Sequence, residues 1–344
     1  MHNHGKASMR KVFWLFDFNV TEKWNDMWQS LWKQDGLELI GLPRSKKRPF
    51  WNLIKASNMA LRVSKKDDII FSWFDFQAVV CFVIGKLTFR RRQIVALNVM
   101  CKFNNSFKGK IYARLYKWAL SSDNFYATVT SREYGKYLNK LLGIHREYVV
   151  IHDANEAKYL LKDSDKLQPI PNSVFMGGTS SRDWDFAFEV AGALPDVTFN
   201  FVMTEDMYSK FKDRCLHNTN VKYAVSLTEF NELAVASTII MMISTTEAPA
   251  GLMLLFLAAA NNKFYMTNYT ATSCEYITHE RGCILPKEIH SWVKAIRYYL
   301  NHSDEAETKA ALLKKYIAEN CTLEQYVKGM KTVCQIIESK SNPQ

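Results

Sequence analysis

Short apolar runs alternate with amphipathic segments along the first 150 residues of the chain. Runs rich in aromatic and β-branched residues indicate strands, and apolar residues spaced three and four apart indicate helices. The predicted strands cover residues 11–18, 37–42, 68–74, 93–99, 125–129 and 148–151, and the predicted helices cover residues 21–34, 77–87, 110–120 and 132–142. This alternation predicts a parallel sheet covered by helices on both faces.

A second alternation follows a polar, charged segment at residues 153–168 that ends at Pro169 and Pro171, a composition typical of a linker. The predicted strands here are 173–176, 198–203, 221–223, 238–243 and 264–267, and the predicted helices are 183–193, 205–212, 228–236 and 251–260. We therefore predict two Rossmann-like α/β domains, residues 9–155 and 170–338, facing a cleft. A ligand is expected in that cleft, at the carboxyl ends of the strands. Residues 1–8 are left out of this prediction.

Positive charge is concentrated in the N-terminal half. The 344 residues carry a formal net charge of +11, but residues 1–150 hold 26 Lys and Arg against 11 Asp and Glu, which gives +15, and the remainder carries −4. A Lys or Arg close to an anionic membrane contributes about 1 kcal/mol to binding. This excess of positive charge is consistent with an N-terminal half that contacts an anionic membrane surface. It is equally consistent with a basic face that is only solvated.

The seven cysteines form no CxxC pair and no regular spacing. This usage indicates neither a disulfide framework nor a zinc site, and it fits a reducing cytoplasm. The most apolar stretch, residues 69–89, is interrupted by Asp75, Gln77 and Lys86, whereas a membrane span needs about 20 mostly apolar residues. With no secretory signal recognised at the start, we expect a cytoplasmic protein, peripheral on the inner face of the membrane.

The first segment that could carry chemistry leads from a predicted strand through Gly177, Gly178 and Thr179 to Arg182 and a predicted helix. Glycines let a ligand approach the backbone, and the start of a helix offers N–H groups and a positive dipole to phosphate. Arg182 could donate paired hydrogen bonds to a diphosphate. A tight turn with a solvent-exposed arginine would produce the same pattern, since short glycine motifs often occur without a ligand.

The second segment has the same organisation: a strand, a polar loop and a helix. Its candidate residues are Thr245, Thr246, Glu247, Ala250, Gly251 and Leu252. The Glu247 carboxylate could accept hydrogen bonds from ribose or sugar hydroxyls while the start of the helix faces phosphate. Alternatively, Glu247 only caps the helix. The apolar run at residues 252–260 is expected to be buried core.

Together, residues 177–184, 221–237, 245–251 and 263–276 with Arg281 and Gly282 resemble the donor half of GT-B glycosyltransferases of family 4. The N-terminal half, including residues 118–122 and 131–133, is similar to the acceptor domains of bacterial members that build surface polysaccharides. The resemblance implies sugar transfer with retained configuration from a nucleotide-sugar, expected to be UDP-linked, to a lipid-linked or saccharide acceptor. It implies no metal or other cofactor and no nucleic-acid partner.

On this resemblance Arg182, Glu247 and His152 are the candidate catalytic residues. Positioned cations must stabilise the leaving diphosphate, and Arg182 is the candidate for that role. His152 follows the last N-terminal strand and could handle a proton, although a lone histidine is more often structural. Ser226 is also expected to contact the nucleotide-sugar donor. Asp17 and Asn19, after the first strand, are the expected acceptor contacts.

Two departures from the family pattern stand out. The family commonly has two glutamates seven residues apart near the second loop; the later one aligns with Phe256, and Glu247 lies one residue out of register with the earlier one. The glycine-rich loop usual after the first strand is replaced by residues 16–20. A non-catalytic glycosyltransferase-like subunit that supports a partner enzyme is therefore an alternative. A nucleic-acid-binding protein would need strongly salt-dependent binding, and no recognised motif supports it.

Overall fold

The structure is a computed structural model that describes residues 11–15, 30, 32, 38–42, 49–103, 106–155, 159–161, 166–179 and 181–341. It divides into two compact units. The first unit contains the described residues up to His152 together with those from Glu324 onwards, and the second unit is Asp153–Leu323. Within the described residues, no helix has both the length and the apolar content that crossing a bilayer requires.

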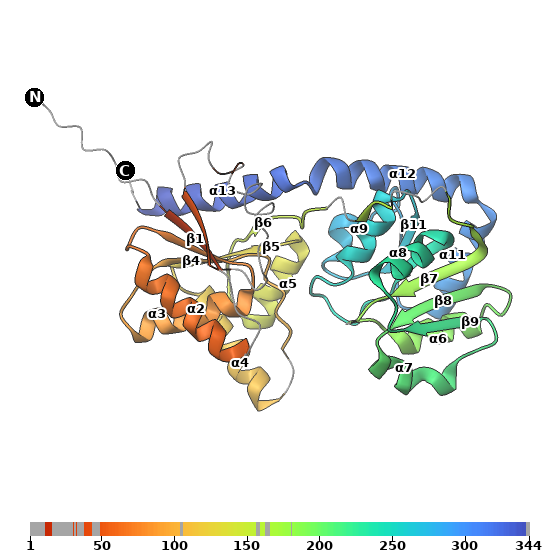
Figure 1. Cartoon of the computed structure of the whole chain (residues 1–344), viewed down its shortest axis with the longest axis horizontal. Helices are drawn as coiled ribbons and strands as arrows, with labels where there is room; N and C mark the ends of the chain where they lie inside the picture. The colour runs from red at the N-terminus through yellow and green to blue at the C-terminus, as the bar shows by residue number, and fades with distance from the viewer. Residues whose placement is uncertain are drawn as a thin grey trace, which may run out of the picture. The chain divides into compact units, whose positions relative to one another are not determined.

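The first unit is built on a parallel sheet, of which Figure 1 labels β1, β4, β5 and β6. Its described strands lie in the order β2-β1-β3-β4-β5-β6. The strands are β1 (Lys11–Leu15), β2 (Glu38–Leu42), β3 (Ile69–Ser72), β4 (Gln93–Ala96), β5 (Phe125–Val129) and β6 (Val149–Val150). The helices are α2 (Pro49–Val63), α3 (Asp75–Leu87), α4 (Phe107–Leu120), α5 (Arg132–Leu142) and α13 (Leu323–Ser341). Every residue of β3 and β5 is buried, as expected for a parallel sheet covered on both faces.

Local signals explain the bounds of α5. The Ser131 hydroxyl accepts a hydrogen bond from the Tyr134 N–H, which caps the start of the helix, and Gly143 ends it with φ 59°. By contrast, the sequence pattern did not predict α2. Its apolar side chains are not confined to one face, since Trp51 is 61% and Val63 is 52% exposed.

The second unit contains a parallel sheet whose described strands have the order β12-β11-β10-β7-β8-β9. The strands are β7 (Ile170–Gly177), β8 (Thr198–Met203), β9 (Thr219–Tyr223), β10 (Ser237–Met242), β11 (Phe264–Asn268) and β12 (Cys283–Leu285). The helices are α6 (Trp184–Gly192), α7 (Glu205–Phe211), α8 (Leu227–Ala236), α9 (Leu252–Ala260), α10 (Ser273–Tyr276), α11 (Ile289–Asn301) and α12 (Ser303–Asn320), with a 3₁₀ turn at Lys212–Arg214. Counted from β7, the order is 3-2-1-4-5-6, the Rossmann arrangement, and it reverses between β7 and β10.

Two apolar cores cover the two faces of this sheet. One contains α6 and α11 side chains, including Trp184 and Trp292, and the other contains α8, α9 and α12 side chains. The residues of α9 from Leu254 to Ala259 are all buried, which confirms the predicted core for this part of residues 252–260, whereas Met253 is 60% exposed. Phe256, 2% exposed, packs against the rings of Tyr159 and Tyr276, with centroids 5.9 and 6.4 Å away. The position where the family pattern has a glutamate is therefore part of an aromatic core.

The helix α13 belongs to the first unit, although the sequence pattern assigned residues 324–338 to the C-terminal domain. The Tyr326 ring packs against Trp73 of the first unit with centroids 6.0 Å apart. Lys340 lies over the Tyr126 ring of β5. A Cβ on Gly329 would come within 2.7 Å of the Ile151 side chain, so the helix needs glycine there to approach the first unit closely.

Candidate functional site

The strand order of the second unit reverses between β7 and β10, and ligands of open α/β sheets bind at such a point, beyond the carboxyl ends of the strands. The loops that follow the two strands are bonded to each other. The Asp183 N–H donates to the Ile243 carbonyl at 2.9 Å, and the Thr245 N–H donates to the Ser181 carbonyl at 3.1 Å. The structure therefore brings the two predicted segments, residues 177–183 and 244–251, together at one edge of the sheet.

The loop after β7 requires both of its glycines. A Cβ on Gly177 would lie 2.5 Å from the Phe230 ring, and Gly178 has φ 135°, a conformation that side-chain-bearing residues rarely adopt. A Cβ on Gly178 would also overlap the Arg182 guanidinium, which folds back over it. The Gly178 N–H donates to the Val202 carbonyl at 3.0 Å, so this amide continues the sheet. Exposed Thr179 follows in the turn.

Arg182 is half-buried and held in place. Its Nε donates to the Gly177 carbonyl at 2.9 Å, and the residue forms an isolated antiparallel bridge with Ser244. Burial lowers the pKa of Arg182, while nearby Tyr265 acts in the opposite direction. The guanidinium stays charged in proteins in any case. A fixed and partly desolvated guanidinium next to the start of the second loop is suited to binding an anion.

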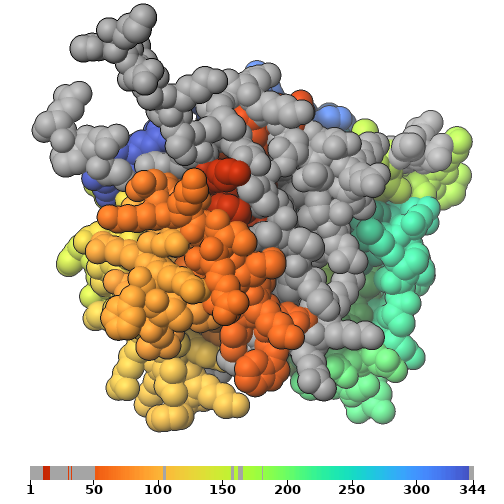
Figure 2. Space-filling view, turned by 60° about the vertical axis from the view of Figure 1, so that its left-hand side comes forward, coloured from red at the N-terminus to blue at the C-terminus, as the bar shows by residue number. Residues whose placement is uncertain are grey.

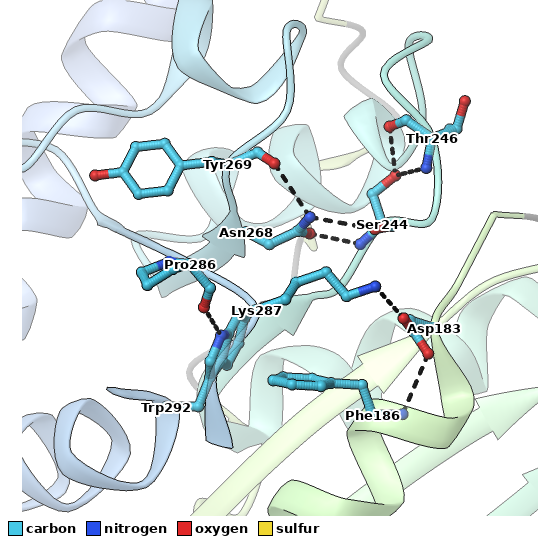
Figure 3. A network of polar contacts seen from close by, with 9 residues as sticks. All are labelled: Asp183, Phe186, Ser244, Thr246, Asn268, Tyr269, Pro286, Lys287 and Trp292. Atoms are coloured by element: carbon cyan, nitrogen blue, oxygen red, sulfur yellow. Dashed lines mark hydrogen bonds and ion pairs between the residues drawn. The ribbon is translucent and has the colours of Figure 1, made fainter. Parts of the chain in front are cut away.

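The loop after β10 is held by Asn268 at the end of β11, as Figure 3 shows. The Asn268 Oδ1 accepts from the Ser244 N–H at 2.6 Å, and its Nδ2 donates to the Ser244 carbonyl at 3.2 Å. The Ser244 hydroxyl accepts from the Thr246 N–H at 3.1 Å, and the Thr246 hydroxyl accepts from the Ala248 N–H at 3.2 Å. This network fixes the path of the chain between β10 and α9.

The amino end of α9 offers backbone donors at this edge. Gly251 precedes the helix with φ 82°, and a Cβ there would come within 2.9 Å of the Met242 side chain. Half-buried Ala250 comes just before it. The N–H groups of Leu252 and Met253 have no acceptor in the described chain, as expected for the first turn of a helix. Such groups, together with the helix dipole, favour an anion.

Glu247 connects the loop after β10 to the loop after β11. Its Oε2 accepts from the Ala271 N–H at 2.5 Å, and its carbonyl accepts from the Thr272 hydroxyl at 2.8 Å. The carboxylate therefore does not cap α9, where Gly251 is the capping residue without a side-chain bond. The other oxygen, Oε1, has no partner among the described residues. It can accept a hydrogen bond from a hydroxyl of a ligand.

The remaining predicted residues lie elsewhere. Ser226 caps α8, where its hydroxyl accepts from the Glu229 N–H at 3.1 Å, and it follows β9, two strands from β7. His152 follows β6 and belongs to the first unit. Asp17 and Asn19 lie outside the described residues.

The sequence patterns did not single out Asn268 or the pair of Asp183 and Lys287. Asp183 caps α6 by accepting from the Phe186 N–H at 3.2 Å and forms an ion pair with Lys287, which follows β12 (Figure 3). One feature of the sequence could have pointed to Asn268: it is a polar residue at the end of an apolar strand. Within the described residues, no group of three or more His, Cys, Asp or Glu is placed to hold a metal ion.

Two helix-covered parallel sheets, one of them with Rossmann order, define the GT-B fold, and solved structures confirm it. Sucrose-phosphate synthase from Thermosynechococcus elongatus aligns with a TM-score of 0.71 and 11% identity over 96% of this chain and 100% of that chain. The Anabaena protein HepE, solved with UDP-glucose, aligns with a TM-score of 0.70 and 13% identity over 94% and 99% of the two chains. WaaG, a glycosyltransferase involved in lipopolysaccharide biosynthesis, gives a TM-score of 0.62 and 11% identity over 95% and 99%. No protein-family model and no curated protein sequence matches the chain.

Proposed function

We propose that the chain is a glycosyltransferase that moves a sugar from a UDP-linked donor to a lipid-linked or saccharide acceptor, with retention of the anomeric configuration. The observation that carries the proposal is the position of Arg182 beside Ser244, at the start of the loop that leads to α9 and at the point where the strand order reverses. The solved structures of similar fold are glycosyltransferases, and one of them was solved with UDP-glucose.

In this proposal the second unit binds the donor. The Arg182 guanidinium and the N–H groups of Leu252 and Met253 hold the diphosphate, and the Oε1 of Glu247 accepts from a hydroxyl of the ribose or of the sugar. Negative charge develops on the diphosphate as the bond to the sugar C1 breaks, so donors fixed in advance stabilise that state. These protein groups supply the positive field, and we propose that no metal ion is needed.

The reaction exchanges one C1–O bond for another. The bond from C1 to the diphosphate oxygen breaks, the acceptor hydroxyl forms the new bond to C1, and the hydroxyl proton passes to the departing diphosphate. Retention requires attack from the side on which the diphosphate leaves. His152 is proposed to assist this proton transfer, and Asp17 and Asn19 remain the proposed acceptor contacts.

A non-catalytic subunit is the second candidate, and the packing of Phe256 favours it. A buried phenylalanine cannot replace the hydrogen bonds of a glutamate. The two candidates differ in turnover. A transferase releases UDP from a UDP-sugar in the presence of membranes that contain the acceptor, whereas a subunit of this kind binds without turnover.

A panel of nucleotide-sugars tests the donor assignment. We expect a UDP-sugar to raise the melting temperature, because a ligand at 100 times its Kd stabilises the folded state by about 2.7 kcal/mol. Differential scanning fluorimetry with UDP-, GDP- and ADP-sugars measures the effect. If none of them shifts the transition at millimolar concentration, the second unit does not bind a nucleotide-sugar.

We also propose that the first unit contacts an anionic membrane surface through α4. The helix contains no Asp or Glu, and its exposed side chains combine basic with apolar groups. These side chains are Phe107, Lys108, Lys110, Ile111, Tyr112, Arg114, Lys117 and Trp118. In Figure 2 the orange-to-yellow segments that contain α2 to α4 form part of the visible surface of the first unit. Basic residues with interspersed aromatic rings are typical of helices that lie in a membrane interface.

Removing two of these charges, in the double variant Lys110→Gln with Arg114→Gln, is expected to weaken binding to vesicles containing phosphatidylglycerol. At about 1 kcal/mol for each charge, the loss is about 30-fold. Vesicle co-sedimentation measures it, with Lys210→Gln and Lys212→Gln on the second unit as the matched control. Equal binding of both variants, or equal binding to neutral phosphatidylcholine, would rule out this surface.

A further inference from the structure

The second unit has a cavity at the amino edge of its sheet, the edge opposite the loops described above. It has a volume of about 350 Å³ and is bordered by the first residues of β10 and β11 and by Pro169, just before β7. The end of α11 and the start of α12 form its other wall. Pockets for small ligands begin at about 300 Å³, so the cavity can hold one sugar unit.

Two opposite charges line this cavity without bonding to each other. Lys263 is half-buried, and Glu307 lies on the first turns of α12. Neither side chain forms a hydrogen bond or ion pair with any described residue. Burial lowers the pKa of Lys263, and Glu307 acts in the opposite direction. A partly desolvated ammonium is stabilised by a hydrogen-bond acceptor, and a carboxylate is stabilised by a donor.

The apolar part of the lining includes two aromatic rings. The rings of Phe264 and Tyr299 pack with centroids 4.2 Å apart, and Pro169 lies on the same cavity. Burial raises the pKa of Tyr299 to about 12, so its hydroxyl stays protonated and can donate. Asn262, which is exposed, adds an amide with both donor and acceptor capacity.

We propose that this cavity is a second binding site, which takes a neutral saccharide unit. A sugar hydroxyl accepts and donates at once, so it can join the Lys263 ammonium to the Glu307 carboxylate. The apolar face of the sugar ring then packs on the Tyr299 and Phe264 side. An anionic ligand fits less well, because α12 also has Asp304 and Glu305 in its first turn and Lys263 is the only basic residue of the lining.

The site lies apart from the proposed donor site within the second unit. Strand β10 runs from the cavity, at Thr238 and Ile239, to the loop after Met242. Because a strand rises about 3.3 Å per residue, the two sites are more than about 10 Å apart along the sheet. Both can be occupied at once. This inference goes beyond the proposed function and does not depend on it.

Saturation-transfer NMR on the full chain tests the site, with methyl α-D-glucopyranoside, N-acetylglucosamine and glucose 1-phosphate as probes. We expect at least one neutral sugar to bind and to remain bound in the presence of saturating UDP. Lys263→Met keeps the apolar stem and removes the charge, and Glu307→Gln removes the charge at constant shape. Each is expected to lower the affinity for the sugar at least tenfold, whereas Lys294→Met, at an exposed position of α11, leaves it unchanged.

Several results would overturn the inference: no binding of any neutral sugar, wild-type affinity in both Lys263→Met and Glu307→Gln, displacement of the sugar by UDP, or preference for glucose 1-phosphate. The same experiment gives a different result if the proposed glycosyltransferase function is wrong. In that case UDP does not bind to the wild-type chain, while the sugar still binds and still responds to Lys263→Met. A melting-temperature measurement on each variant shows that the fold is retained.

Discussion

Arg182→Ala is expected to lower kcat/KM for the UDP-sugar by about 100- to 1000-fold, which is the usual effect of removing one fixed donor from a developing anion. The guanidinium is half-buried and bonded to Gly177, so no other side chain can move into its position without rebuilding the loop. Most of the effect should appear in kcat, because the charge on the diphosphate grows in the transition state. Steady-state release of UDP measures it.

Two further variants separate the role of this charge from a general loss of structure. Arg182→Lys keeps the charge but loses the paired geometry, so its activity is expected between those of the wild type and Arg182→Ala. Arg297→Ala removes an exposed arginine that pairs with Asp196 at 2.9 Å on the same unit, and it should behave like the wild type. Near wild-type turnover by Arg182→Ala would show that the diphosphate is bound elsewhere.

Phe256→Glu, which introduces the residue of the family pattern, is expected to destabilise the second unit strongly. The new carboxylate would replace a ring that packs between Tyr159 and Tyr276 in the buried part of α9, Leu254 to Ala259. Losing such a ring alone costs about 3–5 kcal/mol, and burying an unpaired charge adds to that cost. The expected decrease in melting temperature is at least about 10 °C for a unit of this size.

Met253→Glu is the matched control, because Met253 is on the same helix but is 60% exposed. It should leave the melting temperature close to that of the wild type. Circular dichroism on heating measures both variants. If Phe256→Glu instead folds normally and increases turnover, the aromatic packing is not needed for the fold and a glutamate can function at this position.

Local signals determined which parts of the fold could be predicted. The strands at residues 125–129 and 198–203 and the helix at residues 132–142 have the predicted bounds, because capping and turn residues define their ends. Helices α11, α12 and α13 were not predicted individually. The unit on which α13 packs depends on contacts such as Tyr326 with Trp73, which join residues far apart in sequence and leave no local pattern.

The candidate site could also be predicted only where its signals are local in the sequence. The loops after β7 and β10 could be recognised in the sequence from a strand, a glycine and a helix, and the structure places them together where the strand order reverses, a point at which ligands of open α/β sheets bind. The internal geometry of the loops could not be predicted. The Asn268 bonds to Ser244 join residues 24 positions apart, and they form only because β10 and β11 are neighbours in the sheet.

The return of the chain to the first unit at α13 affects how the two units are synthesised. Residues 153–323 form an uninterrupted segment, so the second unit has all of its residues before α13 leaves the ribosome. The first unit is begun earlier but completed later, because Trp73 and Ile151 receive their contacts with α13 only after α13 has been synthesised. During that interval the apolar surface that α13 will cover is open to solvent, which is the condition under which nascent chains depend on chaperones.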